Sequence, residues 1–152
     1  MTMIVINEDH YVHEVVYGGG SYSITKEKIG TRYVLAAIRI LLDPANPKDV
    51  EQVHGLQDAV SISQKSPGTL EMPNWDPAGQ KKVRDALVVL GSTLPDLKKG
   101  LWKQRTSRPV RHLIATATAW GGNPDKDAVY LNVTPSKNDG ETIYKLNVIG
   151  IV

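Results

Sequence analysis

The chain has 152 residues, of which 41% are hydrophobic and 22% charged, and this composition excludes a largely disordered protein. Lys and Arg number 18 against 16 Asp and Glu, and the resulting net charge of +2 is too balanced for a protein whose main task is to coat nucleic acid. There is no cysteine, which excludes disulfides, thiolate nucleophiles and cysteine-ligated metal centres. We expect a single domain over residues 1–152.

The first 42 residues predict β-strands. An apolar run, Met3–Ile6, begins this part, and residues 11–17 are rich in Val and Tyr, which favour a half-buried strand. Three glycines then predict a turn into a return strand over residues 21–25. A longer apolar run over residues 33–42 predicts another strand.

Residues 43–122 predict a mainly helical segment. Three places combine a residue that can cap a helix with a proline that begins it: Asn46-Pro47, Asp76-Pro77 and Ser107-Arg108-Pro109. Apolar residues follow at helical spacing, and glycines at 91 and 121 predict the ends of the second and third helices. We therefore expect about three helices.

Residues 126–152 predict a β-hairpin. Residues 128–134 and 142–152 alternate between apolar and polar, and Asn138-Asp139-Gly140 between them is typical of a turn. The order of strands, helices and hairpin predicts an α+β fold with a largely antiparallel sheet. Because Met3–Ile6 and residues 146–152 look like apolar strands without protecting charges, we expect an unpaired sheet edge and hence a homodimer.

The densest polar cluster lies at residues 8–14. If these residues form a strand, His10 and Glu14 point to one face, and Asp9, Tyr11 and His13 to the other. The spacing is not that of a His-Glu-x-x-His metal motif, so we interpret the cluster as the polar end of a strand and expect no metal and no cofactor. Asp9, His10 and Tyr11 are nevertheless candidate ligand-binding residues.

The string Trp120-Gly121-Gly122 is the second candidate site. We interpret it as a helix end covered by a packed Trp120. In the alternative interpretation, the glycines allow a ligand to approach, and Trp120, Gly121 and Gly122 bind it. His112 lies near a helix start, where the dipole disfavours a cation, so a neutral imidazole is expected.

A basic stretch with one tryptophan precedes the third helix. It comprises Lys98, Lys99, Trp102, Lys103, Arg105, Arg108 and Arg111. We interpret it as a solvated loop. Anion or nucleic-acid binding is a weaker alternative, because basic residues beside an aromatic ring can hold phosphates and stack a base.

Several strings, taken in order, resemble a known family. They are Glu8-Asp9-His10-Tyr11-Val12, Ile29-Gly30-Thr31-Arg32-Tyr33-Val34, Pro73-Asn74-Trp75-Asp76, Lys82-Val83-Arg84-Asp85-Ala86-Leu87, Pro109-Val110-Arg111-His112-Leu113-Ile114, Trp120-Gly121-Gly122-Asn123-Pro124 and Ala128-Val129-Tyr130-Leu131-Asn132-Val133-Thr134-Pro135. The set resembles the bacterial domain-of-unknown-function family 1254, which is usually paired in one chain with family 1214.

The resemblance implies a β-sandwich of jelly-roll type with an inserted helical segment, and it implies no activity. Members of that family are longer and are often exported, and they have an early Asn-x-Asp-Thr-x-Tyr-type motif that this sequence lacks. The chain therefore resembles an internal slice of a family member, or a minimal version of one.

Together these features predict a non-catalytic, self-associating module, with a small ligand as a further expectation. The alternative is a hydrolase for a small or carbohydrate-like substrate, with Asp9, His10, Tyr11 and Trp120 as its candidate residues. No signal peptide begins the sequence, and no apolar run reaches the roughly 18 residues of a membrane helix, so we expect a cytoplasmic protein without membrane insertion.

Overall fold

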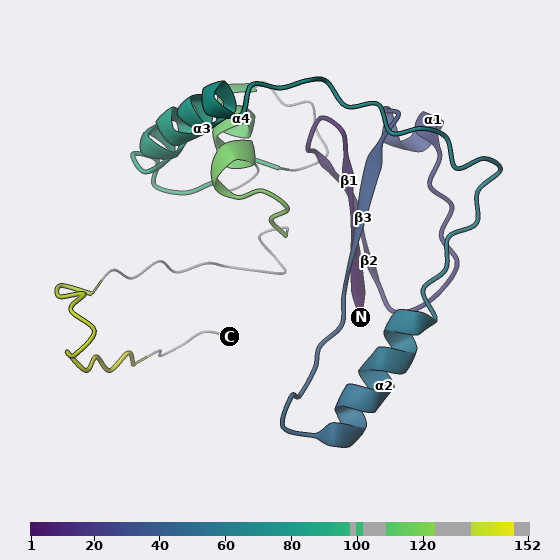
Figure 1. The fold of residues 1–152 in the computed structure, drawn as a ribbon, viewed down its shortest axis with the longest axis horizontal. Helices are drawn as coiled ribbons and strands as arrows, with labels where there is room; N and C mark the ends of the chain where they lie inside the picture. Colours follow the sequence, from purple (N-terminus) through teal and green to yellow (C-terminus); the bar gives the residue numbers. More distant parts are fainter. Residues whose placement is uncertain (98–99, 102–108, 124–134, 148–152) are drawn as a thin grey trace.

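The structure is a computed structural model and describes residues 1–97, 100–101, 109–123 and 135–147. In chain order, its elements are β1 (Thr2–Asn7), β2 (Val12–Tyr17), α1 (Lys26–Ile29), β3 (Val34–Arg39), α2 (Pro47–Asp58), α3 (Pro77–Gly91) and α4 (Pro109–Thr118). α3 and α4 pack together beside the sheet, and α2 lies at the opposite end of the molecule (Figure 1). None of the helices in the described ranges is both long enough and apolar enough to cross a membrane.

The three strands form one antiparallel sheet in the order β2-β1-β3. One face contains the core cluster of Ile4, Ile6 and Val12, against which Val15, Ala37 and Leu101 pack. Val5 points to the other face and is also buried, at 1% exposure. The central strand is therefore buried on both faces, whereas β3 has no buried residue.

The starts of α2 and α3 confirm the capping prediction, whereas Ser107 and Arg108, which precede α4, lie outside the described residues. The Asn46 side chain accepts a hydrogen bond from the backbone N–H of Lys48 at the start of α2. The Asp76 side chain accepts hydrogen bonds from the backbone N–H groups of Ala78 and Gly79 at the start of α3. α4 begins at Pro109, as the sequence predicts. The starts of α2 and α3 depend on local hydrogen bonding, which explains why the sequence predicts them well.

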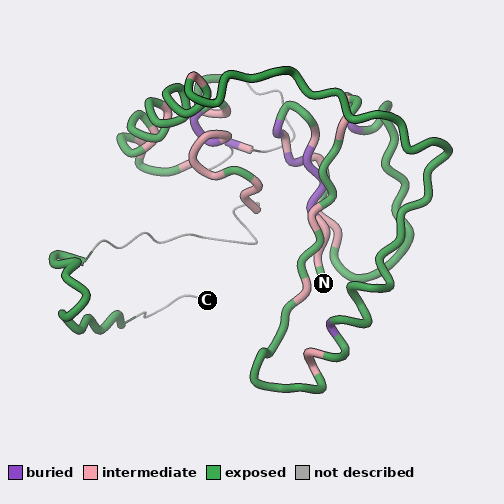
Figure 2. Tube along the Cα trace, viewed as in Figure 1, coloured by how far each residue is buried: buried purple, intermediate pink, exposed green. Residues whose placement is uncertain are grey.

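α3 packs against α4 without burying any of its residues. The contact is close at Gly91, where an added Cβ would lie 2.8 Å from Cγ2 of Thr118. The predicted apolar stripe of α3 is consequently open to solvent. Figure 2 shows the exposed helix beside the partly buried α4.

The predicted strand over residues 21–25 is wrong, and so is the hairpin turn at the three glycines. Thr25 instead caps α1, where its side chain accepts a hydrogen bond from the N–H of Lys28. Gly30 ends that helix with φ of 84°. The hairpin joins β1 to β2 through residues 8–11, so the chain turns before the glycines and not at them.

The expected jelly-roll β-sandwich is also wrong. A sandwich needs two packed sheets, and the described residues contain one open sheet of three strands with helices beside it, which is a small α+β fold. Within the predicted hairpin over 126–152, residues 142–147 are not a strand, while 128–134 and 148–152 lie outside the described residues.

The edges of the sheet differ from those expected. Met3–Ile6 belongs to the central strand β1, which pairs with β2 on one side and with β3 on the other. The start of the chain is therefore not an unpaired edge, contrary to the expectation that led to a dimer through Met3–Ile6. The edge strands of the sheet are β2 and β3.

Candidate functional site

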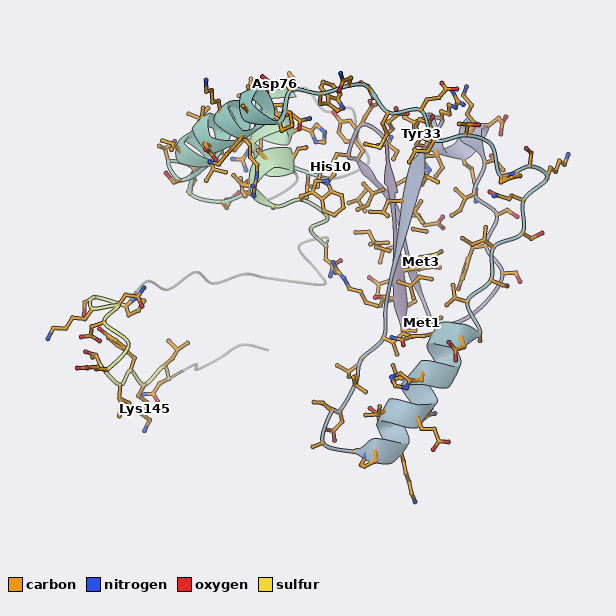
Figure 3. The ribbon with its side chains drawn as sticks, viewed as in Figure 1. Met1, Met3, His10, Tyr33, Asp76 and Lys145 are labelled. Carbon is orange, nitrogen blue, oxygen red and sulfur yellow. The ribbon has the colours of Figure 1, made fainter. Side chains whose placement is uncertain are left out.

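The residues that the sequence singled out meet where three segments converge. These are the turn between β1 and β2, the pair Gly100–Leu101, and α4 with the residues that follow it. Figure 3 shows His10 between the sheet and the α3–α4 pair. The N–H of Val12 donates to the carbonyl of Leu101 at 2.7 Å, which joins the start of β2 to the second segment.

Asn7 shapes the turn that presents His10. Its side-chain oxygen accepts from the N–H of Tyr11 at 2.8 Å, and its carbonyl accepts from the N–H of His10 at 2.9 Å. His10 itself has φ of 65°, a left-handed conformation that is uncommon outside glycine. The alternation of faces predicted for residues 8–14 therefore fails, because residues 8–11 form a turn and not a strand.

His10 is a buried histidine whose two ring nitrogens both have partners. The N–H of Gly121 donates to Nε2 at 3.0 Å, so the ring proton is on Nδ1 and donates to Oγ1 of Thr116 at 3.1 Å. His10 is only 7% exposed. Burial, and after it the charge of nearby His112, lowers the pKa of His10 below its usual value.

His112, on the first turns of α4, binds two backbone carbonyls. Its Nδ1 lies 2.7 Å from the carbonyl oxygen of Gly100, and its Nε2 lies 2.9 Å from that of Asp9. The ring also stacks on Tyr11, with 3.8 Å between ring centroids and 6° between planes. A histidine donates from both nitrogens only as the imidazolium, so this geometry does not suit the neutral ring expected from the helix dipole.

Trp120 is not the packed lid that we expected. It is 67% exposed, and one face of its indole stacks on His10 with 5.7 Å between centroids and 26° between planes. Gly121 does adopt the left-handed conformation expected after the helix, with φ of 67°, but the indole of Trp120 stacks on His10 and stays largely exposed.

The predicted candidates thus contribute unequally. His10, Tyr11 and Trp120 supply rings to the cluster, Gly121 supplies an N–H, and Asp9 supplies only its carbonyl. Gly122 is packed within its own turn, where a Cβ would lie 2.9 Å from the carbonyl oxygen of Ala119 and 3.1 Å from Cδ1 of Leu101.

Sequence reasoning missed the partners of these residues. Thr116 follows His112 by four positions and so lies on the same side of α4, which is a signal that helical periodicity could have supplied. Gly100 gave no signal, although a Cβ there would lie only 2.5 Å from that of Ala115. The stacking of His112 on Tyr11 joins residues far apart in the sequence, and neither residue alone predicts it.

A groove of about 610 Å³ lies between α3 and α4, close to this cluster. Its walls are mainly apolar, and Thr116 contributes to them while also accepting the hydrogen bond from His10. The residues that line it are Trp75, Asp76, Gly79, Gln80, Val83, Arg84, Leu87, Leu113, Thr116 and Ala117. Most of the basic stretch lies outside the described residues, but Arg111 lies within them and pairs with Asp96 at 2.8 Å.

This arrangement is suited to stacking and not to proton transfer. Each ring nitrogen of His10 and His112 already faces an internal partner. Among the residues that the structure describes, no three His, Asp or Glu side chains are grouped so that they could hold a metal ion. The open face of Trp120 is the part of the cluster that a ligand could reach.

Comparison of the chain with models of protein families, with curated proteins and with solved structures finds no match. The resemblance to the domain-of-unknown-function family 1254 therefore stays a prediction from the sequence.

Proposed function

We propose that the chain is a non-catalytic module that associates with a second copy of itself. The observation that supports this is the number of large apolar side chains that stay exposed among the described residues.

Several of these side chains lie on β3, where Val34 and Leu35 are each 41% exposed. Covering such side chains is the main driving force of association, so a second copy would stabilise the fold.

The hydrolase alternative has less support. A histidine that acts as a general base must have a ring nitrogen free to take a proton from a substrate or a water molecule. In His10 and His112, the two histidines of this site, every ring nitrogen already has a partner inside the protein, so neither is free to form a catalytic pair with Asp9. A non-catalytic role is consistent with this geometry.

Light scattering at micromolar concentration tests self-association directly. We expect a mass of twice 16.7 kDa and a return toward 16.7 kDa on dilution. A folded chain that keeps the monomer mass at every concentration would contradict the proposal.

A second candidate function, binding of a flat or sugar-like ring, is favoured by the open face of Trp120. His10 holds the other face of the indole in place, so a ligand could stack without ordering the side chain. Titration with adenosine and with a methyl glucoside, followed by tryptophan fluorescence, would test it. Binding that persists in Trp120→Ala would place the ligand elsewhere, and a lack of binding by both probes would count against this function.

A further inference from the structure

We propose that the two copies join edge to edge through β3, in an antiparallel pair centred on Ala36. This inference rests on the proposed self-association and adds its surface and its register. The product would be one continuous sheet with three strands from each copy. Exchange of backbone hydrogen bonds between edge strands is a recurring mode of protein association.

β3 is the open edge of the sheet. Within the described ranges, the backbone of Val34–Arg39 makes its hydrogen bonds only to β1, so its outer row of N–H and C=O groups faces no other backbone. Apart from Arg39 at its end, the strand has neither a charged residue nor a proline that would discourage pairing.

β2, the other edge, is less suited to this role. Its first residue, Val12, already donates a backbone hydrogen bond to Leu101 beyond the sheet. The exposed Glu14 also lies in the middle of β2, and a charged side chain on an edge strand discourages pairing with another chain. The comparison between the two edges therefore selects β3.

The sequence of β3 selects the register. A two-fold axis through Ala36 places Ala36 opposite itself, Val34 opposite Ile38, and Leu35 opposite Ala37. All of these pairs are apolar, and Val34 and Ile38 are 41% and 37% exposed in the single chain. Arg39 then lies beyond the paired residues, whereas an axis through Ala37 would put it opposite Leu35.

Single cysteines give a sharp test, because the natural chain has none. Facing residues of an antiparallel pair have Cα atoms about 4.5–5.5 Å apart, which suits a disulfide. Under mild oxidation, Ala36→Cys should convert almost fully to a covalent dimer. Val34→Cys is on the same face and is also exposed, but it should not form a covalent dimer alone, because Val34 does not face itself in this register. It should cross-link when mixed with Ile38→Cys.

Charge gives an independent test. Ala36→Lys places two ammonium groups opposite each other at the centre of the pair, and Ala36 is exposed in the single chain, so the fold tolerates the substitution. We expect the dissociation constant of the dimer to rise by about tenfold or more. Ser63→Lys, at an exposed position outside the strands, is the matched control and should leave it unchanged.

The outcomes separate the two proposals. If the natural chain is a dimer but Ala36→Cys does not cross-link and Ala36→Lys dissociates no more than the control, self-association stands and the β3 pairing is refuted. If Val34→Cys alone cross-links as readily as Ala36→Cys, the register is refuted. A natural chain that is monomeric throughout contradicts both proposals.

Discussion

Replacement of His10 tests how the β1–β2 turn is held against α4. His10→Ala removes the hydrogen bonds of the ring to Gly121 and Thr116. Each such bond contributes about 1 kcal/mol net, so we expect the free energy of unfolding to fall by about 2 kcal/mol. His10→Gly removes the same bonds but relieves the left-handed backbone, whose φ of 65° costs a non-glycine residue about 1 kcal/mol or more.

The greater freedom of glycine in the unfolded chain offsets part of that relief. We therefore expect the Gly variant to be more stable than the Ala variant by about 0.5–1 kcal/mol. Urea unfolding followed by circular dichroism measures both. His54→Ala, at an exposed position of α2, is the control and should change the free energy of unfolding by less than about 0.5 kcal/mol.

Two results would refute this reasoning. If His10→Ala were no more destabilising than His54→Ala, the two ring hydrogen bonds would contribute nothing to stability. If the Ala and Gly variants of His10 were equally stable, the turn would not hold a left-handed residue at this position.

The same residue predicts a pH dependence. Because the folded state lowers the pKa of His10, the unfolded chain binds more protons once the pH falls below about 6.5. The stabilising contribution of the neutral ring is therefore complete above that pH and is lost as the solution is acidified. The free energy of unfolding of the natural chain should fall more between pH 7.5 and pH 5.5 than that of His10→Gly, and equal losses would contradict the prediction.

Three further predictions concern other parts of the chain. Trp120→Ala should lower the free energy of unfolding by only about 0.5–1.5 kcal/mol, the value of a ring contact, because the side chain is 67% exposed; a loss of about 3 kcal/mol or more would indicate a buried ring. Asp76→Ala should cost about 1 kcal/mol by removing the cap of α3, whereas Asp76→Ser should cost much less, and urea midpoints compare the two. Hydrogen bonds from the backbone and hydroxyl of Thr142 and from the N–H of Glu141 lower the pKa of Asp139 to about 2, so carboxyl NMR should show titration near that value, and a usual midpoint would mean that these hydrogen bonds do not form.

The parts of the fold that the sequence predicted well are those set by near neighbours. Asn46 and Asp76 cap helices through N–H groups two or three residues away, and a reader of the sequence can see both partners. The same locality explains the error at residues 21–25. Alternation suggested a strand there, but Thr25 caps a short helix through Lys28, and no neighbouring strand competes for its backbone among the described residues.

The candidate site was predicted in part. Its rings stood out by residue type, and His10, Tyr11 and Trp120 do lie in one cluster. The partners of the His10 ring, Thr116 and Gly121, could not be predicted, because the tertiary fold brings them to it. The turn itself has a local signal, because the Asn7 side chain accepts a hydrogen bond from the N–H of Tyr11. The exposure of Trp120 also depends on the tertiary fold, because its stacking partner His10 comes from the other end of the chain.

The hydrogen bonds of this cluster join residues that are far apart in the chain, with sequence separations of 103, 106 and 111. Closing a loop of about 100 residues costs about 4 kcal/mol of chain entropy before any contact between its ends is gained. The β1–β2 hairpin and the helices need no such closure, so they can form earlier than the cluster. Substitutions at His10 or His112 should therefore accelerate unfolding while leaving the refolding rate nearly unchanged.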